Sequence, residues 1–85
     1  MPATVDLELL TRPACSLCVK ARSAFEEAAR DLGVAISIHE VDIDADPALR
    51  KRYGLRIPVV RRSGLDLCEG VIRPAEARSA LVASA

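Results

Sequence analysis

The junction between residues 10 and 18 constrains the fold of this chain more than any other segment. An alternating stretch, Val5 to Leu10, becomes continuously apolar and predicts a strand with a buried end, and a helical pattern starts at Ser16. Cys15 and Cys18 lie at this boundary with two residues between them. The unpaired N–H groups in the first turn of a helix favour an anion, and therefore a thiolate over a thiol. The junction predicts a strand followed by a helix, with a reactive thiol between them.

Three elements are predicted from local patterns. Between Ser16 and Leu32, apolar residues recur at three- and four-residue steps and predict one buried helix face, which Gly33 should end. The stretch Val34–Val41 is rich in β-branched residues and predicts a second strand. Asp46 followed by proline is typical of a helix start, so a short helix is predicted over Pro47–Tyr53.

The C-terminal half predicts a hairpin followed by a helix. Strands are expected over Ile57–Arg62 and Leu65–Glu69 with a tight turn at Ser63-Gly64, and a last helix should begin at Pro74. Two early strands joined by a long helix should be parallel with a right-handed crossover, and the hairpin adds antiparallel strands. We therefore predict an α/β fold in β-α-β-α-β-β-α order: a four-stranded mixed sheet with three helices, placed on both faces. Its site should lie beyond the C-terminal end of the first strand.

Length and charge exclude several classes of function. A chain of 85 residues has room for one small domain, residues 1–85, and no second core. The 12 basic and 12 acidic residues cancel, which argues against nucleic acid or an anionic membrane as the main partner. No apolar run approaches the ~20 residues of a membrane span. The N-terminus, Met1 to Asp6, lacks the basic and apolar regions of a signal peptide, so we expect a cytoplasmic protein.

The number of cysteines limits the kinds of site that they can form. Three cysteines is an odd number that does not suit a secreted disulfide framework. In a reducing compartment a close cysteine pair is more often catalytic or metal-binding than structural. The composition and spacing alone therefore leave redox work and metal binding open.

Three motifs together resemble a known family. They are Leu-Thr-Arg-x-x-Cys-x-Leu-Cys at Leu10–Cys18, Val-Asp-Ile-Asp at Val41–Asp44 and Tyr-Gly-x-x-Ile-Pro-Val at Tyr53–Val59. In this order and spacing they resemble the thioredoxin-like fold in its small glutaredoxin-like form, and in particular the bacterial family of short glutaredoxin-like proteins. The resemblance covers nearly the whole chain.

The resemblance implies a role for individual residues. Cys15 matches the exposed attacking cysteine and Cys18 the resolving cysteine. Pro58 matches a proline with a cis peptide bond that faces the active-site disulfide. Ile57 matches the residue whose backbone pairs with an incoming peptide or glutathione. Arg12 stands where glutaredoxins place a basic residue near the glutathione carboxylate.

The function implied by this resemblance is thiol–disulfide oxidoreduction, in electron transport and cell redox homeostasis. The expected partners are a disulfide-containing protein or glutathione, and a reductase as electron donor; we expect a monomer with no bound cofactor and with glutathione as a candidate co-substrate. Two departures qualify this expectation. Ser16-Leu17 replaces the usual Pro-Tyr between the cysteines, and Cys68-Glu69 stands where glutaredoxins carry a glycine pair. The second departure favours a protein disulfide over a glutathione mixed disulfide, because a glycine pair lets a ligand approach the backbone closely.

Two other classes of function remain open, a metal-binding or iron–sulfur carrier module and a redox-inert interaction domain. A structural zinc site normally has four ligands, and beyond Cys15 and Cys18 only Cys68 and His39 could contribute. These two residues have no second paired spacing, so we expect no metal site. Cys68 is interpreted as a small, partly buried apolar residue, with a redox or regulatory thiol as the alternative. His39 is interpreted as a partly exposed strand residue, and Tyr53 as an edge residue of the core.

Overall fold

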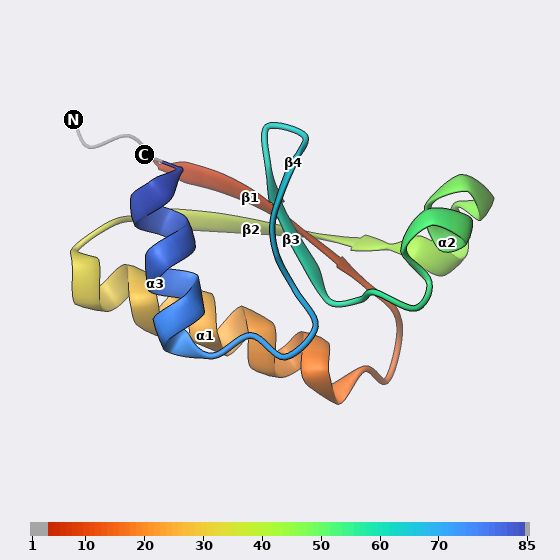
Figure 1. Ribbon diagram of the computed structural model, residues 1–85, viewed down its shortest axis with the longest axis horizontal. Helices are drawn as coiled ribbons and strands as arrows, with labels where there is room; N and C mark the ends of the chain where they lie inside the picture. The colour runs from red at the N-terminus through yellow and green to blue at the C-terminus, as the bar shows by residue number, and fades with distance from the viewer. Residues whose placement is uncertain (1–3, 85) are drawn as a thin grey trace.

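A computed structural model describes residues 4–84, so residues 1–3, on which part of the signal-peptide prediction rests, and residue 85 lie outside the described residues. The seven predicted elements all form, in the predicted order, with one additional 3-10 turn (Figure 1). They are β1 (Val5–Thr11), α1 (Ser16–Leu32), β2 (Ile36–Asp42), η1 (Ile43–Ala45), α2 (Pro47–Tyr53), β3 (Val59–Arg62), β4 (Leu65–Glu69) and α3 (Pro74–Ala83). The α/β class and the thioredoxin-like element order are confirmed.

The four strands form one mixed sheet in the order β2-β1-β3-β4. β1 and β2 are parallel over their whole length, from Val5 opposite Ile36 to Thr11 opposite Asp42. β3 runs antiparallel to both β1 and β4. Because the C-terminal ends of β1 and β2 meet at one edge, the β1–α1 loop, which carries Cys15, lies at that edge, as predicted.

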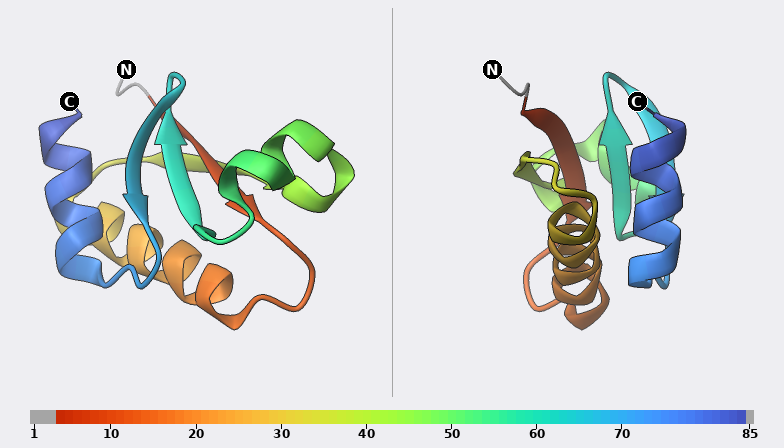
Figure 2. Two further views of the ribbon diagram at one scale, coloured as in Figure 1. Left: turned by 45° about the vertical axis from the view of Figure 1, so that its right-hand side comes forward. Right: turned by 90° about the vertical axis from the view of Figure 1, so that its left-hand side faces the viewer.

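Helices cover both faces of the sheet, which confirms the predicted layers. Leu7 and Leu9 of β1 point into a core shared with α1 and α3, where Phe25 is fully buried. Leu10 points to the opposite face and packs with Tyr53 of α2. Figure 1 shows α2 at the end of the sheet away from α3, and Figure 2 shows α1 and α3 together on one side. None of the helices formed by residues 4–84 is long and apolar enough to cross a bilayer.

Local signals explain the boundaries that were predicted correctly. Gly33 ends α1 in the left-handed conformation, with φ 67°, which a glycine adopts at little cost. The Asp46 carboxylate caps α2 by accepting hydrogen bonds from the N–H groups of Ala48 and Leu49, at 2.9 and 3.3 Å. Ser63 and Gly64 both have positive φ, as a two-residue hairpin turn of the I′ type requires.

The two strands whose starts were mispredicted begin later than expected. β2 starts at Ile36 rather than Val34, because the Val34 N–H still donates to the Ala29 carbonyl at the end of α1, over 2.9 Å. β3 starts at Val59 rather than Ile57, because Pro58 has no N–H with which to join the sheet. The 3-10 turn η1 was not predicted.

Candidate functional site

Cys15 and Cys18 lie where the first turn of α1 begins. Cys15 is the N-cap residue, with an extended backbone, and its sulfur accepts a hydrogen bond from the Cys18 N–H over 3.2 Å. The two Cα atoms are 5.2 Å apart and the two sulfurs form a disulfide. At this position a backbone N–H of the helix, that of Cys18, donates to the sulfur of Cys15.

The two cysteines differ in accessibility. Cys15 is partly exposed, whereas the Cys18 residue is only 3% exposed. A cleft opens beside them, lined by residues 11–16, Cys18, Val19, Glu40 and Asp42. A group that enters this cleft reaches the Cys15 sulfur before the Cys18 sulfur.

Arg12 lines the same cleft, which brings together three of the five residues singled out in the sequence. Its Nη2 lies 3.3 Å from a carboxylate oxygen of Asp44 on η1, and both side chains are partly exposed. The guanidinium is therefore already paired with an acid, and an anionic ligand at this position would compete with Asp44.

Ile57 and Pro58 do not line the cysteine cleft. Their peptide bond is cis, as the resemblance implies, and the Pro58 carbonyl accepts a hydrogen bond from the Gly70 N–H over 2.9 Å. Because Val59 pairs with Leu10, Pro58 comes next to Thr11, and Thr11 does line the cleft. The two residues are thus neighbours of the cleft on its β3 side rather than part of its wall.

Cys68 lies apart from the redox pair. It lies on β4 and is partly buried, and its sulfur is 3.8 Å from the Glu76 carbonyl oxygen of α3. Burial, and then the negative charge of Glu76, raise the pKa of the Cys68 thiol. His39 is exposed on β2, and across residues 4–84 no three side chains of the His, Cys, Asp and Glu types are grouped to hold a metal ion.

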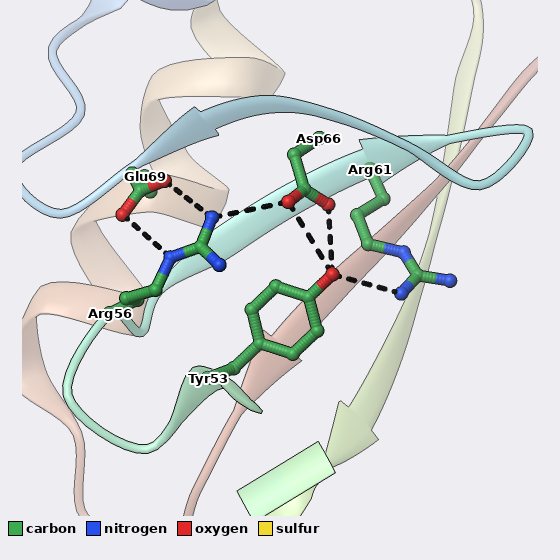
Figure 3. Close-up of polar contacts among 5 residues, drawn as sticks. All are labelled: Tyr53, Arg56, Arg61, Asp66 and Glu69. Carbon is green, nitrogen blue, oxygen red and sulfur yellow. Dashed lines mark hydrogen bonds and ion pairs between the residues drawn. The ribbon is translucent and has the colours of Figure 1, made fainter. Parts of the chain in front are cut away.

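A polar network on the α2 face of the sheet was missed in the sequence (Figure 3). Tyr53 is 1% exposed, and its hydroxyl donates to Asp66 over 3.2 Å and accepts from Arg61 over 3.5 Å. Arg56 donates twice to Glu69, over 3.1 and 2.8 Å, and once to Asp66, over 3.2 Å. The Arg56 guanidinium also lies 4.8 Å from the centre of the Tyr53 ring. These contacts join the loop before β3 to the strand β4.

The charges in this network shift one another's pKa values. The hydrogen bond from Arg56, and then its positive charge, lower the pKa of Glu69. The hydrogen bond to Glu69 is the main cause of the raised pKa of Arg56. One signal could have revealed part of the network, since a two-residue turn places Arg61 opposite Asp66 in the hairpin. The contacts of Arg56 had no such signal, because it lies in a loop.

Comparison with known proteins identifies relatives over most of the chain. The family described as Glutaredoxin-like domain (DUF836) matches residues 6–81. An uncharacterized protein of Mycobacterium tuberculosis is 38% identical over 62 residues, which are 69% of this chain and 64% of that protein. The chain thus spans less than two thirds of the length of this relative. A protein of Methanothermobacter thermautotrophicus named as a probable thioredoxin is 31% identical over 62 residues, 72% of this chain and 73% of that protein.

Solved structures show the same fold. The structural genomics target XcR50 from X. campestris has a TM-score of 0.78 and 35% identity, over 91% of this chain and 96% of that one. Thioredoxin-2, a component of the malaria parasite protein secretion machinery, has a TM-score of 0.58 and 16% identity, over 100% of this chain and 86% of that one. At this identity the second likeness shows the fold alone.

Proposed function

Because the chain belongs to the Glutaredoxin-like domain (DUF836) family of the thioredoxin-fold superfamily, we propose that it is a thiol–disulfide oxidoreductase. Cys15 and Cys18 form its redox pair. The observation that carries this proposal is the difference between the two sulfurs. Cys15 is the accessible one and receives the Cys18 N–H, whereas Cys18 is buried one turn into the helix.

The proposed reaction has two exchange steps. The Cys15 thiolate attacks one sulfur of a substrate disulfide, so that a mixed disulfide forms, the substrate S–S bond breaks and the other substrate sulfur leaves as a thiolate. The Cys18 thiolate then attacks the Cys15 sulfur, which releases the second substrate thiolate and forms the Cys15–Cys18 disulfide. The substrate gains two electrons, the protein loses two, and water protonates the released thiolates. A reductase restores the dithiol.

The start of α1 supports the first step. The Cys18 N–H and the other free donors in the first turn stabilise negative charge on the Cys15 sulfur. The burial of Cys18 supports the separate roles of the two cysteines. A substrate in the cleft meets Cys15 first, and Cys18 then resolves the mixed disulfide.

We propose a protein disulfide as the main substrate, with glutathione as the alternative. Two charged groups that could have bound the charged ends of glutathione already have partners. Arg12 pairs with Asp44, and Glu69 pairs with Arg56. A protein disulfide needs neither charged group, because an extended chain can bind through its backbone.

Dithiothreitol-driven reduction of insulin, with and without the protein, tests the proposed activity. We expect the wild type to accelerate the reaction, Cys15→Ser to return it to the uncatalysed rate, and Cys68→Ser, the matched control, to keep the wild-type rate. Cys68 is a suitable control because it is the free cysteine and lies outside the cleft. Full activity in Cys15→Ser would refute the proposed function.

A further inference from the structure

A second hollow, distinct from the cysteine cleft, lies between α2 and the β1–α1 loop and is strongly basic. Five cationic side chains line it, namely Arg12, Arg50, Lys51, Arg52 and Arg56, and no acidic side chain of residues 4–84 does so. The chain as a whole has 12 basic and 12 acidic residues, so this hollow is a local concentration of positive charge on a neutral molecule. We call it the basic hollow.

Three of these cations have no acidic partner in the described part of the chain. Arg12 and Arg56 are each paired with carboxylates. In contrast, Arg50, Lys51 and Arg52 are exposed, and none of the ion pairs within residues 4–84 includes them. Their positive charges are therefore available to acidic groups of another molecule.

The helix dipole explains only part of this arrangement. Arg50, Lys51 and Arg52 occupy the last turn of α2, where the negative end of the dipole favours cations. The dipole does not account for Arg12, which comes from the β1–α1 loop and lines the same hollow. It also does not account for Leu55, a fully exposed apolar side chain in the lining. Apolar contact combined with charge complementarity is typical of surfaces that bind proteins.

The basic hollow adjoins the proposed redox site. Arg12 lines both the hollow and the cleft beside Cys15. Figure 1 shows α2 at the same end of the sheet as the β1–α1 loop. A protein that binds to the hollow therefore lies next to the cleft, where a disulfide of that protein can meet the Cys15 sulfur.

We propose that the basic hollow docks an acidic segment of the protein whose disulfide reacts with Cys15. This inference rests on the proposed function and names its substrate class, proteins with carboxylates near the reacting disulfide. Complementary charge raises the rate of encounter and orients the partner, and the cations themselves touch no reacting atom. An acidic protein fits better than a nucleic acid, because no aromatic side chain within residues 4–84 lines the hollow as a platform for bases.

Peptide disulfides that differ only in charge test the inference. Each contains the same cystine, flanked by glutamate, glutamine or lysine residues, and the second-order rate constant for oxidation of the reduced protein is measured with each. In the wild type at low ionic strength, we expect the glutamate peptide to react about tenfold faster than the glutamine peptide, at the low end of the range for electrostatic steering. The lysine peptide should react more slowly than the glutamine peptide. At about 1 M salt, where the screening length is about 3 Å, the three rate constants should converge.

A double variant assigns the preference to the basic hollow. R50Q/K51Q removes two exposed, unpaired charges, and its preference for the glutamate peptide over the glutamine peptide should fall below about threefold. R30Q/R78Q is the matched control, because it removes the same charge from exposed positions on α1 and α3 that do not line the hollow. The control should keep the full preference. The salt dependence of the wild type needs no variant, so it tests the inference even if R50Q/K51Q fails to fold.

Three results would overturn the inference. One is a wild-type rate constant at low salt that does not depend on the charge of the peptide. Another is a preference for glutamate that R50Q/K51Q retains. The third is tighter binding of a single-stranded DNA oligonucleotide than of a polyglutamate peptide of equal charge, since this would assign the hollow to nucleic acid. Failure of the proposed function gives a different result, namely oxidation by the peptides that is unchanged in Cys15→Ser.

Discussion

The N–H of Cys18 lies 3.2 Å from the sulfur of Cys15 and donates to it. This contact is at once the N-cap of α1 and the interaction that would stabilise a thiolate on Cys15. The start of the helix and the start of the proposed reaction therefore depend on the same backbone geometry, and the residue at the cap cannot be changed without affecting both.

Cys18→Ser should trap the first intermediate of the proposed reaction. Without the second sulfur, the mixed disulfide between Cys15 and a substrate has no internal nucleophile and should accumulate. Mass spectrometry of the reduced variant mixed with a peptide disulfide would detect an adduct of one peptide per chain. Cys15→Ser should give no adduct under the same conditions, and turnover of Cys18→Ser at the wild-type rate would contradict the assigned order of attack.

Tyr53 should contribute to stability mainly through its ring and less through its hydroxyl. Tyr53→Phe removes the hydrogen bonds to Asp66 and Arg61 but leaves Asp66 paired with Arg56, so we expect a loss of about 1 kcal/mol. Tyr53→Ala also removes a ring that is 99% buried, since the residue is 1% exposed, and should cost about 3–5 kcal/mol. Urea unfolding curves give both changes in the free energy of unfolding. Equal losses in the two variants would show that the hydroxyl, and not the ring, provides the stabilisation by Tyr53.

The Arg56–Glu69 pair should make stability depend on pH in the acid range. The pKa of Glu69 is lowered from its ordinary value of 4.5 in the folded state, so the carboxylate binds its proton less readily there than in the unfolded chain. Its contribution is therefore fully present above pH 4.5 and is lost as the pH falls through the lower, folded pKa.

NMR titration of the Glu69 carboxyl carbon tests the lowered pKa from which this pH dependence follows. In Arg56→Gln the pKa of Glu69 should rise toward its ordinary value, because the hydrogen bond and the positive charge of Arg56 are its causes of lowering. Arg73→Gln, at the N-cap of α3, should leave the titration unchanged, because Arg73 pairs with Glu76. An equally low pKa of Glu69 in Arg56→Gln would show that another group stabilises the carboxylate.

Cys68 should react slowly in the folded protein. Burial and the charge of Glu76 raise the pKa of its thiol, so less thiolate is present at pH 8, and burial also restricts access. With Cys15 and Cys18 oxidised, alkylation by iodoacetamide should be at least about tenfold slower in buffer than in denaturant. Glu76→Gln should speed it modestly. Equal rates in buffer and denaturant would contradict the partly buried position of Cys68.

Local sequence patterns determined most of the secondary structure. The bounds of α1, α2 and β4 agree with the prediction, because the apolar repeat, the Asp46 cap and the two-residue turn each act within a few residues. The starts of β2 and β3 were mispredicted, because a hydrogen bond at the end of α1 and the missing N–H of Pro58 delay the first strand residue. Val34 does not join β2, because its N–H donates to the Ala29 carbonyl at the end of α1.

The sequence by itself determined the order of the elements, the fold that the three motifs share and the position of the cysteine pair at the start of a helix. Only the tertiary structure decided which groups meet around that pair. Arg12 lies on the cysteine cleft already paired with Asp44, and Arg56 reaches Glu69 across 13 residues of chain. The physical reason is the separation along the chain of the residues that interact. Caps and turns depend on neighbours in the chain. These ion pairs depend instead on how η1 lies beside the β1–α1 loop and how the loop before β3 meets β4, which no single segment encodes.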